Sequence, residues 1–439
     1  MKYFLIGIKG AGMSSLACIL YDLGNLVLGS DQNTGYSFTL EKLMSRNIEI
    51  FPHNKDNIKE DYIIIKSPAI KDDNEEVVRA RKLGLQIYDY PKFVGKFTKD
   101  YNLIAISGCH GKTTTTSLLS HIFKNTIGCN FIVGDGTGES DKNSNLFILE
   151  ACEYRRNFLN YYPNTTIITN IELDHVDYYK DIEDIKDAYQ SLINQTKKLV
   201  IACGDDLNIR DLKFRQVLFY GFNSNNDYFI TNIKQKDNGM SFDLYYLDNL
   251  LDNFYIPFYG EHMILNAVAS IIVLLEHKIS ISLIKDNLLT FMGAKRRFDE
   301  YIYDDVVMID DYAHHPTEIK MTIKAAKDKY PNKKLIAVYE PHTYSRTSIL
   351  KNEIIESLKL ADKVYVMDIY SAREKSIDFP NITSKIIIDN IDNADAISID
   401  TIDKIMNEKD VVILFMSAKN DMMRLKYDEI KKMEVDLNG

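Results

Sequence analysis

Short apolar runs alternate with longer amphipathic stretches along most of the chain. The first series begins with YFLIGI (3–8), followed by a glycine cluster and MSSLACILYDLG (13–24), and this order predicts a strand, a tight turn and a helix. Two more apolar runs follow at 25–31 and 61–70. Such continuous runs are typical of buried parallel strands, whose carboxyl ends gather ligands. Residues 1–98 are therefore expected to form a small α/β domain.

The alternation restarts after residues 93–102, which we interpret as a linker. Residues 99–295 are expected to form a second domain in which strands alternate with helices. After Tyr228 the pattern becomes alternating and rich in turn residues, which predicts an antiparallel insert with a turn at Asn238-Gly239. The strand candidates are NLIAISG (102–108), NLFILE (145–150), TTIITN (165–170), KKLVIACGDD (197–206) and QVLFYGF (216–222), and the helical candidates include 180–196 and 261–278.

A third α/β series begins at Arg296, so residues 296–439 are expected to form the last domain. Alternating strands and helices favour a mostly parallel sheet. The fold class is therefore α/β, with three domains. The strand candidates of the third domain lie in VVMIDDYAHHP (306–316), KLIAVYEPH (334–342), KVYVMDIY (363–370) and VVILFMSAKND (411–421), and its first helix is PTEIKMTIKAAKDKY (316–330).

The composition is that of an ordinary soluble globular chain. Of the 439 residues, 45% are hydrophobic and 26% are charged. The net charge of −10 argues against a nucleic-acid partner, because phosphate backbones are bound by clustered lysines and arginines. The longest apolar run, 266–275, is shorter than the ~20 residues that a membrane span needs. We therefore expect no nucleic acid and no membrane insertion.

The cysteines and the N-terminus bear on location. The five cysteines form no C-x-x-C pair, so neither a zinc site nor a disulfide framework is indicated. A reducing, cytoplasmic location fits this cysteine usage best. Glycines interrupt the apolar N-terminal stretch MKYFLIGIKGAGMSSLA, which disfavours a signal peptide. The sequence defines no oligomeric state.

The stretch SGCHGKTTTT (107–116) is the strongest chemical signal. A standard phosphate loop reads G-x-x-x-x-G-K-[ST], which would place glycine at position 106, where the chain has isoleucine. The other elements agree, since an apolar strand precedes Gly111, Lys112 and Thr113 and a helix follows them. Such a turn directs backbone N–H groups at an anion, while lysine adds a charge and threonine a ligand for Mg²⁺. We interpret it as a variant nucleotide-binding loop.

Acidic residues and a histidine follow two other strands of the same domain. Glu150 ends a strand and Glu153 comes three residues later, while Asn170, Asp174 and His175 follow the next strand. Oxygen ligands at strand ends beside a phosphate loop are well placed to hold a magnesium ion. An alternative stays open, in which Glu150 and Glu153 only cap the end of their strand.

Two histidine-rich segments follow strands of the third domain. DDYAHHPTEI contains Tyr312, His314 and His315, and EPHTYSRT contains His342 and Arg346. Adjacent histidines could bind a metal. The proline that follows them favours the first turn of a helix, so the segment could instead present donors to an anion or a carboxylate. A purely structural role of either segment also stays open.

The N-terminal glycines Gly7, Gly10 and Gly12 are spaced G-x-x-G-x-G. The dinucleotide-binding pattern is G-x-G-x-x-G, so this is a rearranged relative of that pattern. Asp31 follows Gly12 by 19 residues, where an acidic residue would contact a ribose. A diphosphate-containing ligand fits, NAD included, and so does a plain tight turn.

Taken together, these motifs resemble those of the Mur ligase family. The resemblance runs along nearly the whole chain and rests on the order of GIKGAGMS, CHGKTTT, EACEY, TNIELDHVDYY, GEHMILNA, GAKRRFDE, DDYAHHPTEI and PHTYSRT. It implies a central P-loop mononucleotide-binding ATPase domain between two Rossmann-like domains. The phosphate loop of this family lacks the first Walker glycine, which accounts for Ile106.

The resemblance also implies a reaction. ATP, with Mg²⁺, phosphorylates the lactyl carboxylate of UDP-N-acetylmuramate, and the amine of L-alanine attacks the resulting acyl phosphate to give an amide and phosphate. Charge that builds on the transferring phosphoryl group would be stabilised by lysine and Mg²⁺. The neighbouring possibility is a recycling ligase that adds a preformed peptide to the same sugar acid. An NAD-dependent oxidoreductase and a non-catalytic nucleotide-binding regulator are alternatives of other classes.

Site residues are carried over from the resemblance as expectations. The catalytic residues are Lys112, His175 and Arg346. The ATP-binding residues are Gly108, Cys109, His110, Gly111, Lys112, Thr113, Thr114, His262, Asn266, Arg297 and Asp311. The metal ligands are Thr113, Glu150, Glu153 and His175. The UDP-sugar residues are Gly10, Gly12, Met13, Ser14, Asp31 and Ser67, and the amino-acid residues are Tyr312, His314, His342 and Arg346.

The chain departs from the family pattern at three places. Met263 stands where relatives usually have asparagine, and Cys109 stands where relatives often have threonine. Near the C-terminus, Ser417-Ala418-Lys419 replaces a Gly-Ala-Gly sequence. A loop without these glycines would approach its ligand less closely.

Overall fold

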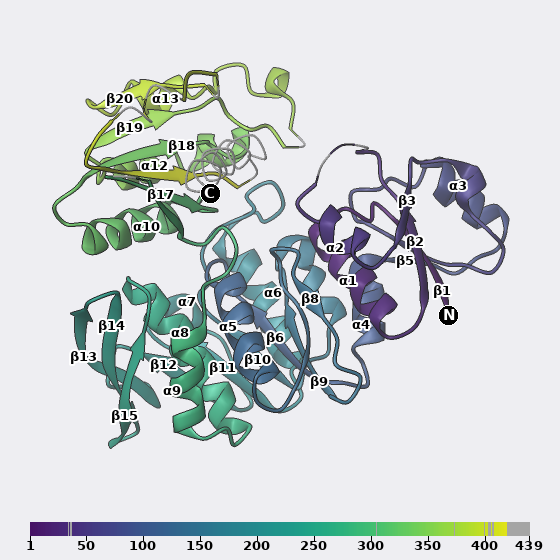
Figure 1. Ribbon diagram of the computed structural model, residues 1–439, viewed down its shortest axis with the longest axis horizontal. Helices are drawn as coiled ribbons and strands as arrows, with labels where there is room; N and C mark the ends of the chain where they lie inside the picture. The colour runs from purple at the N-terminus through teal and green to yellow at the C-terminus, as the bar shows by residue number, and fades with distance from the viewer. Residues whose placement is uncertain are drawn as a thin grey trace, which may run out of the picture.

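The computed structural model describes residues 1–418, apart from residues 34, 36, 304, 373, 399, 403, 404, 406 and 407. The described part contains three β-sheets, which follow one another along the chain (Figure 1). Each sheet lies within one of the three ranges expected from the sequence. The points at which the domains begin and end stay predictions.

The first sheet is parallel, with strand order β3-β2-β1-β4-β5. Side chains alternate between its faces, so Leu5 packs with α1 while Phe4 and Ile6 pack with α3. Its strands are β1 (Lys2–Ile6), β2 (Leu26–Ser30), β3 (Glu49–Phe51), β4 (Ile63–Lys66) and β5 (Ile87–Asp89). Its helices are α1 (Ala11–Asp22), α2 (Leu40–Met44), α3 (Glu75–Lys82) and α4 (Tyr90–Phe97), with the 3₁₀ helix η1 (Lys55–Asn57).

The linker expected at 93–102 is wrong for its first half, because residues 93–97 belong to α4. Phe93 and Val94 are buried, and Phe97 packs edge-on against Phe147 of the second sheet with ring centroids 6.1 Å apart. Gly95 in this helix makes a close contact with the second domain, since a Cβ atom there would lie 2.0 Å from the Asn160 carbonyl oxygen.

The second sheet has the order β15-β14-β13-β12-β11-β10-β6-β9-β7-β8. β6, β9, β10, β11 and β12 are parallel, and β13 to β15 form the expected antiparallel part. The hairpin turn lies at Asp237-Asn238, one residue before the predicted position, because Gly239 already pairs with Lys236.

The remaining elements of the second domain complete the layers around this sheet. The strands are β6 (Asn102–Ser107), β7 (Asn130–Ile132), β8 (Gly138–Glu139), β9 (Leu146–Glu150), β10 (Thr165–Ile168), β11 (Leu199–Cys203), β12 (Val217–Gly221), β13 (Tyr228–Lys236), β14 (Gly239–Tyr246) and β15 (Asn249–Ile256). The helices are α5 (Lys112–Lys124), η2 (Tyr154–Asn160), α6 (Ile182–Gln195), α7 (Leu207–Arg210), α8 (Glu261–Glu276) and α9 (Ile281–Thr290).

The third sheet has the order β16-β17-β21-β18-β19-β20, and only β16 among its described strands is antiparallel to its neighbour. Its strands are β16 (Asp299–Tyr303), β17 (Val306–Asp311), β18 (Lys334–Tyr339), β19 (Lys363–Val366), β20 (Ala394–Ala396) and β21 (Val411–Met416). Its helices are α10 (Pro316–Lys329), α11 (Tyr344–Ile349), α12 (Lys351–Leu358), η3 (Ser376–Asp378) and α13 (Lys385–Ile388).

The first two sheets share one hydrophobic core, and the third sheet has buried clusters of its own. One buried cluster extends from Tyr3 in the first sheet to Phe291 after α9, so the first two sheets share a core. The buried clusters of the third sheet contain only residues from 306 to 416. Within the described residues, we find no helix with the length and apolarity required to span a membrane.

Candidate active site

The carboxyl ends of three neighbouring strands of the second sheet form the floor of the candidate site. β6 lies between β9 and β10, and all three strands are parallel. The phosphate loop follows β6, the segment with Glu150 and Glu153 follows β9, and the segment from Thr169 to His175 follows β10. The topology thus brings the expected phosphate loop and the expected acidic residues to one edge of the sheet.

Two glycines let the phosphate loop lie very close to its neighbours. Gly108 has φ +139°, and a Cβ atom there would lie 1.9 Å from Thr169 Oγ1. Gly111 has φ +80°, and a Cβ atom there would lie 2.4 Å from Asn266 Oδ1 on α8. Any side chain would push the loop away from these neighbours, so glycine is required at both positions. Asn266, expected near the nucleotide, therefore packs directly against the loop.

Lys112 begins α5 and turns its ammonium group back over the loop. Nζ donates to the carbonyl oxygens of Gly108 (2.5 Å) and Cys109 (3.0 Å) and forms an ion pair with Glu153 at 3.0 Å. Burial by itself lowers the pKa of Lys112, but the Glu153 carboxylate outweighs burial and the pKa lies above its usual value. Lys112 is therefore a fixed positive charge at a helix N-terminus, where an anion is favoured.

Thr113, Glu150, Glu153 and His175 form a polar cluster beside the loop. Glu150 accepts hydrogen bonds from the Thr113 hydroxyl at 3.1 Å and from the Gly134 N–H at 2.6 Å, while His175 Nε2 lies 3.2 Å from Glu153 Oε1. Burial by itself raises the pKa of Glu153, but the loop lysine and His175 lower it below its usual value. Ionised carboxylates and a hydroxyl are ligands that suit Mg²⁺. This donor set fits a magnesium ion.

A buried ion pair joins the second domain to the third. Arg346, on α11, pairs with Asp174, and its Nη1 atom donates to His342 Nδ1 at 2.8 Å. Its Nε atom makes no hydrogen bond within the described part of the chain. The His314 ring lies 5.4 Å from both the Tyr312 and the His342 rings, and burial lowers the His314 pKa to about 4. Three of the expected amino-acid residues therefore lie around the guanidinium group of the fourth, Arg346.

The expected nucleotide residues of the third domain are engaged with their own surroundings. Asp311 accepts the N–H groups of Phe298 and Ala313, both at 2.8 Å, and burial raises its pKa to about 6. Arg297 is held at 3.4 Å by a carboxylate of α10. His262 at the start of α8 is neutral, because burial lowers its pKa to about 4.

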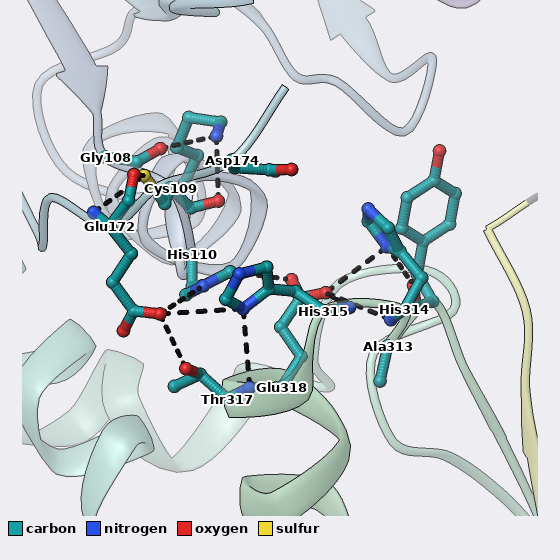
Figure 2. A network of polar contacts seen from close by, with 12 residues as sticks. Gly108, Cys109, His110, Glu172, Asp174, Ala313, His314, His315, Thr317 and Glu318 are labelled. Carbon is teal, nitrogen blue, oxygen red and sulfur yellow. Dashed lines mark hydrogen bonds and ion pairs between the residues drawn. The ribbon is translucent and has the colours of Figure 1, made fainter. Parts of the chain in front are cut away.

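A polar network connects the phosphate loop to α10 (Figure 2). His110 lies between two carboxylates, with Nδ1 3.3 Å from Glu318 Oε1 and Nε2 3.5 Å from Glu172 Oε2. Glu172 Oε2 also accepts the Thr317 hydroxyl at 2.6 Å and lies 3.5 Å from His315 Nδ1. His110 and Glu172 belong to the second domain and the other three residues to the third, so this network spans the two domains.

Glu172 and Glu318 face the phosphate loop, and the sequence analysis did not single them out. Glu318 is the third residue of α10, and its carboxylate accepts the N–H group of His315, the residue that caps the helix. A glutamate three residues after a capping residue is a recognisable sequence signal, although it indicates only a helix start. The contact of Glu318 with the phosphate loop depends on how two domains meet, and no local pattern carries that information.

The glycine cluster of the first domain forms the N-terminus of α1. Gly10 is the N-cap residue, and Met13 and Ser14 lie buried in the first turn. A Cβ atom on Gly12 would lie 2.6 Å from the Tyr90 hydroxyl, so glycine lets this turn pack against α4. The turn leaves the helix N-terminus, with its unpaired N–H groups, at the edge of the sheet.

Asp31 and Ser67 follow β2 and β4 and lie at the same edge of the first sheet. Asp31 accepts the N–H groups of Lys9 at 2.9 Å and Asn33 at 3.0 Å, so its carboxylate shapes the surrounding loops. A Cβ atom on Gly7 would lie 2.9 Å from the Ser67 Cβ atom. The expected UDP-sugar residues therefore gather at one end of α1.

The segment 134–138 links this edge to the metal candidates. A Cβ atom on Gly138 would lie 2.7 Å from the Ser15 Cβ atom of α1, so the segment packs closely on that helix. At the other end, Gly134 donates its N–H to Glu150. The segment 134–138 thus connects the first-domain candidates with the second-domain candidates.

Three family models cover most of the chain. The Mur ligase family catalytic domain matches residues 2–102, the Mur ligase middle domain matches residues 106–274, and the Mur ligase glutamate ligase domain matches residues 296–418. The chain belongs to the Mur ligase family. This confirms the resemblance read from the motifs and the three-domain α/β fold.

Within the Mur ligase family, two UDP-N-acetylmuramate–alanine ligases are similar to this chain along almost its whole length. The UDP-N-acetylmuramate–L-alanine ligase of Ligilactobacillus salivarius strain UCC118 is 43% identical over 420 residues, which are 95% of this chain and 94% of that protein. The crystal structure of the UDP-N-acetylmuramate–alanine ligase MurC from Thermotoga maritima matches with a TM-score of 0.82 at 26% identity, covering 99% of this chain and 100% of that one.

A murein peptide ligase structure is also similar to this Mur ligase. The Psychrobacter arcticus enzyme matches with a TM-score of 0.70 at 23% identity, covering 95% of this chain and 96% of that one. At this level of identity the match concerns the fold alone.

The departures from the family pattern have structural accounts in this Mur ligase. The Cys109 thiol donates to the Glu172 carbonyl oxygen and accepts the Glu172 N–H, both at 3.1 Å, so it provides both functions of a hydroxyl. Met263 packs against the core of the second domain. Ser417 is buried and donates its hydroxyl to Glu340 at 2.6 Å. Lys419 lies outside the described residues.

Proposed function

We propose that this protein is an ATP-dependent ligase that joins L-alanine to the lactyl carboxylate of UDP-N-acetylmuramate in peptidoglycan precursor biosynthesis. The observation that carries the proposal is its likeness, along almost its whole length, to an L-alanine ligase of 43% identity. The site geometry supports it, because the phosphate loop, the acidic cluster and a buried arginine meet in one place. The substrates are small molecules, and a cytoplasmic location is part of the proposal.

The nucleotide end of the site has the groups that phosphoryl transfer requires. Lys112 would hold the β- and γ-phosphates, since its charge lies at the N-terminus of α5. Thr113 and Glu150 would hold Mg²⁺, with Glu153 and His175 as further ligands. Bound Mg²⁺ would neutralise charge that builds on the phosphoryl oxygens. Arg297 of the third domain would add its positive charge when the domains close.

The sugar acid would lie between the first and second domains. Its diphosphate suits the N-terminus of α1, a twelve-residue helix whose first turn carries Gly12, Met13 and Ser14. The segment 134–138 would then direct the lactyl carboxylate toward Glu150 and the metal. Phosphorylation turns a carboxylate oxygen into a good leaving group, which the acyl-transfer step needs.

The amino acid would bind between the second and third domains. Arg346 is the proposed partner of its carboxylate. In this structure one nitrogen of the guanidinium group, Nη2, pairs with the Asp174 carboxylate. Charge-assisted pairs of arginine with carboxylates are among the strongest polar contacts in proteins. Neutral His314 lies beside them and is suited to accept a hydrogen bond or a proton from the attacking amine.

A recycling ligase that adds a preformed peptide to the same sugar acid is the alternative. Its support is weaker, because the murein peptide ligase structure above is 23% identical whereas the L-alanine ligase is 43% identical. Ligase chemistry accounts for the phosphate-loop lysine, which an NAD-dependent oxidoreductase would leave without a role.

The deciding experiment mixes the purified protein with Mg-ATP, UDP-N-acetylmuramate and L-alanine, and follows phosphate release and product mass. The proposal requires phosphate release that depends on all three substrates and a product heavier by one alanyl residue. Lys112→Ala is expected to lower kcat by a factor on the order of 1,000 or more, since it removes the positive charge that stabilises the transferring phosphoryl group. Turnover with a peptide but not with alanine would identify the recycling enzyme. Full activity of Lys112→Ala would refute the assignment of the loop.

A further inference from the structure

Glu318 contacts three separate parts of the candidate site with one carboxylate. Its Oε1 atom faces His110 of the phosphate loop at 3.3 Å and Arg297 at 3.4 Å. Its Oε2 atom accepts the N–H groups of His314 at 3.2 Å and His315 at 3.4 Å. Glu318 therefore lies between the nucleotide loop and the segment that carries the amino-acid residues.

The phosphate loop is held from its other side by Glu172. Its backbone forms two contacts with the Cys109 thiol, and its side chain faces His110 and accepts the Thr317 hydroxyl (Figure 2). Residues 109 and 110 are thus held between their own domain and the first turn of α10. A shift of α10 would move His110, and with it the backbone that presents N–H groups to a phosphate.

The geometry of His110 indicates a charged ring. Both ring nitrogens face carboxylate oxygens at ion-pair distance, although neither makes a hydrogen bond within the described residues, and two facing carboxylates favour a ring that carries hydrogen on both nitrogens. Burial by itself lowers the His110 pKa, but Glu318 and Glu172 outweigh burial and raise the pKa to about 9. The distances of 3.3 and 3.5 Å are those of ion pairs and are longer than those of good hydrogen bonds.

Other charged groups face His110 and Glu318, but they do not change the sign of either pKa shift. Burial by itself raises the Glu318 pKa, but nearby histidines and arginine hold it well below its usual value. Glu318 is therefore ionised throughout the range from pH 6.5 to about 9, in which the His110 contact is lost. The titratable and charged groups that face the pair are Glu172, His262, Arg297, Asp311, Tyr312, His314, His315, Tyr339 and Arg346.

A divalent metal ion is the competing explanation of the same cluster. His110, Glu172 and His315 offer three ligand atoms within 4.8 Å of one another. The His315 nitrogen that faces Glu172 is Nδ1, and its lone pair already accepts the Thr317 N–H at 3.4 Å and so caps α10. A metal would also need neutral His110, against the charge that two carboxylates impose. The contacts therefore favour a proton at this position over a metal.

We propose that Glu318 is a positioning residue, which through His110 holds the phosphate loop against α10 and so fixes the ATP site relative to the amino-acid pocket. The proposal rests on the proposed function. It assigns to Glu318 a role that acts on both ends of the reaction, although the carboxylate itself contacts neither substrate.

Glu318→Gln is the test variant, because glutamine keeps the oxygen that accepts the helix-capping N–H groups and removes only the charge. We expect kcat/KM for ATP to fall about 10- to 100-fold at pH 7.5, since a charged contact is replaced by a neutral one. The stronger signature is the pH profile. The His110 contact contributes fully below about pH 6.5 and is lost as the pH rises through about 9. In Glu318→Gln the alkaline limb should therefore move toward neutral pH.

Two further measurements separate this role from a loss of folding. Glu353→Gln changes an exposed glutamate of α12 and should leave the activity and the pH profile as in the unmodified protein. The double variant His110→Gln/Glu318→Gln should lose little activity beyond either single variant, because both remove the same contact. An unmoved alkaline limb, or losses that multiply in the double variant, would overturn the proposal.

The test also remains informative if the proposed function fails. Binding of Mg²⁺ with the non-hydrolysable β,γ-imido analogue of ATP can be measured by calorimetry between pH 6.5 and about 10 without turnover. The proposal requires affinity that falls through about pH 9 in the unmodified protein and at lower pH in Glu318→Gln. Stoichiometric binding of Zn²⁺ alone, abolished by His315→Gln and by Glu172→Gln, would replace the proton with a metal and overturn it.

Discussion

The second domain meets its two neighbours through interfaces of opposite kinds. Toward the first domain it shares a continuous hydrophobic core, with contacts such as Phe97 against Phe147. Toward the third domain the described contacts at the site are ionic, and they include the Arg346–Asp174 pair and the His110–Glu318 pair. Apolar burial is non-directional and insensitive to pH, whereas paired charges depend on geometry and protonation. The first junction therefore depends on apolar burial, and the second depends on paired charges.

The largest expected effect comes from breaking the apolar junction. Phe147 is fully buried and contacts both Phe97 and Tyr101. Phe147→Ala should lower the free energy of unfolding by about 3–5 kcal/mol, because a large cavity remains. Chemical denaturation measures this loss, and Leu207→Ala, at a side chain that is 80% exposed, is the control. A loss below about 1 kcal/mol would mean that the two domains do not share a core.

A smaller effect is expected from breaking the polar junction. Arg346→Ala leaves the Asp174 carboxylate buried without its partner and removes the proposed ligand of the alanine carboxylate. KM for L-alanine should rise by a factor on the order of 100, and the free energy of unfolding should fall by about 1–3 kcal/mol because the buried Asp174 carboxylate loses its partner. Steady-state kinetics measures the change in KM, and chemical denaturation of the same variant measures its unfolding. Arg215→Ala, at an exposed position, should change neither.

The smallest expected effect sharpens the contrast in pH dependence. At the first junction, burial lowers the pKa of Lys42 from 10.5 to about 8. Loss of this buried charge therefore makes the junction more stable as the pH rises from about 8 to 10.5. The raised pKa of His110 has the opposite sign, so the second junction weakens as the pH rises from 6.5 to about 9. Lys42→Met should stabilise the fold at pH 7 on the order of 1 kcal/mol and reduce its gain at alkaline pH.

Thermal unfolding of Lys42→Met followed from pH 7 to about 10 measures this difference. Lys59→Met, at an exposed lysine, serves as the matched control. If Lys42→Met is less stable than the unmodified protein at pH 7, the hydrogen bonds of Lys42 to the Gly136 carbonyl oxygen and Ser15 matter more than its burial.

The features that could be predicted from the sequence are those that depend on local patterns of residues. The alternation of apolar runs gave the three α/β series, and the rule that parallel strands end at one edge brought Lys112, Glu150 and His175 together. The prediction was wrong at α4, where the first half of the expected linker is helical and Gly95 makes a close contact with Asn160. Glu172 and Glu318 were missed for a different reason, because their partners lie 62 and 208 residues away along the chain at His110. Contacts across two separately folded units leave no periodic signal.

The setting of Cys109 has a consequence for chemical reactivity. Its side chain is buried, its thiol hydrogen is directed at a backbone carbonyl oxygen, and burial raises its pKa well above the usual value. Alkylating agents and peroxides react with the thiolate form of cysteine, which is scarce under these conditions. A sulfur atom in the middle of a nucleotide-binding loop is therefore protected against oxidation by the same contacts that hold the loop in shape.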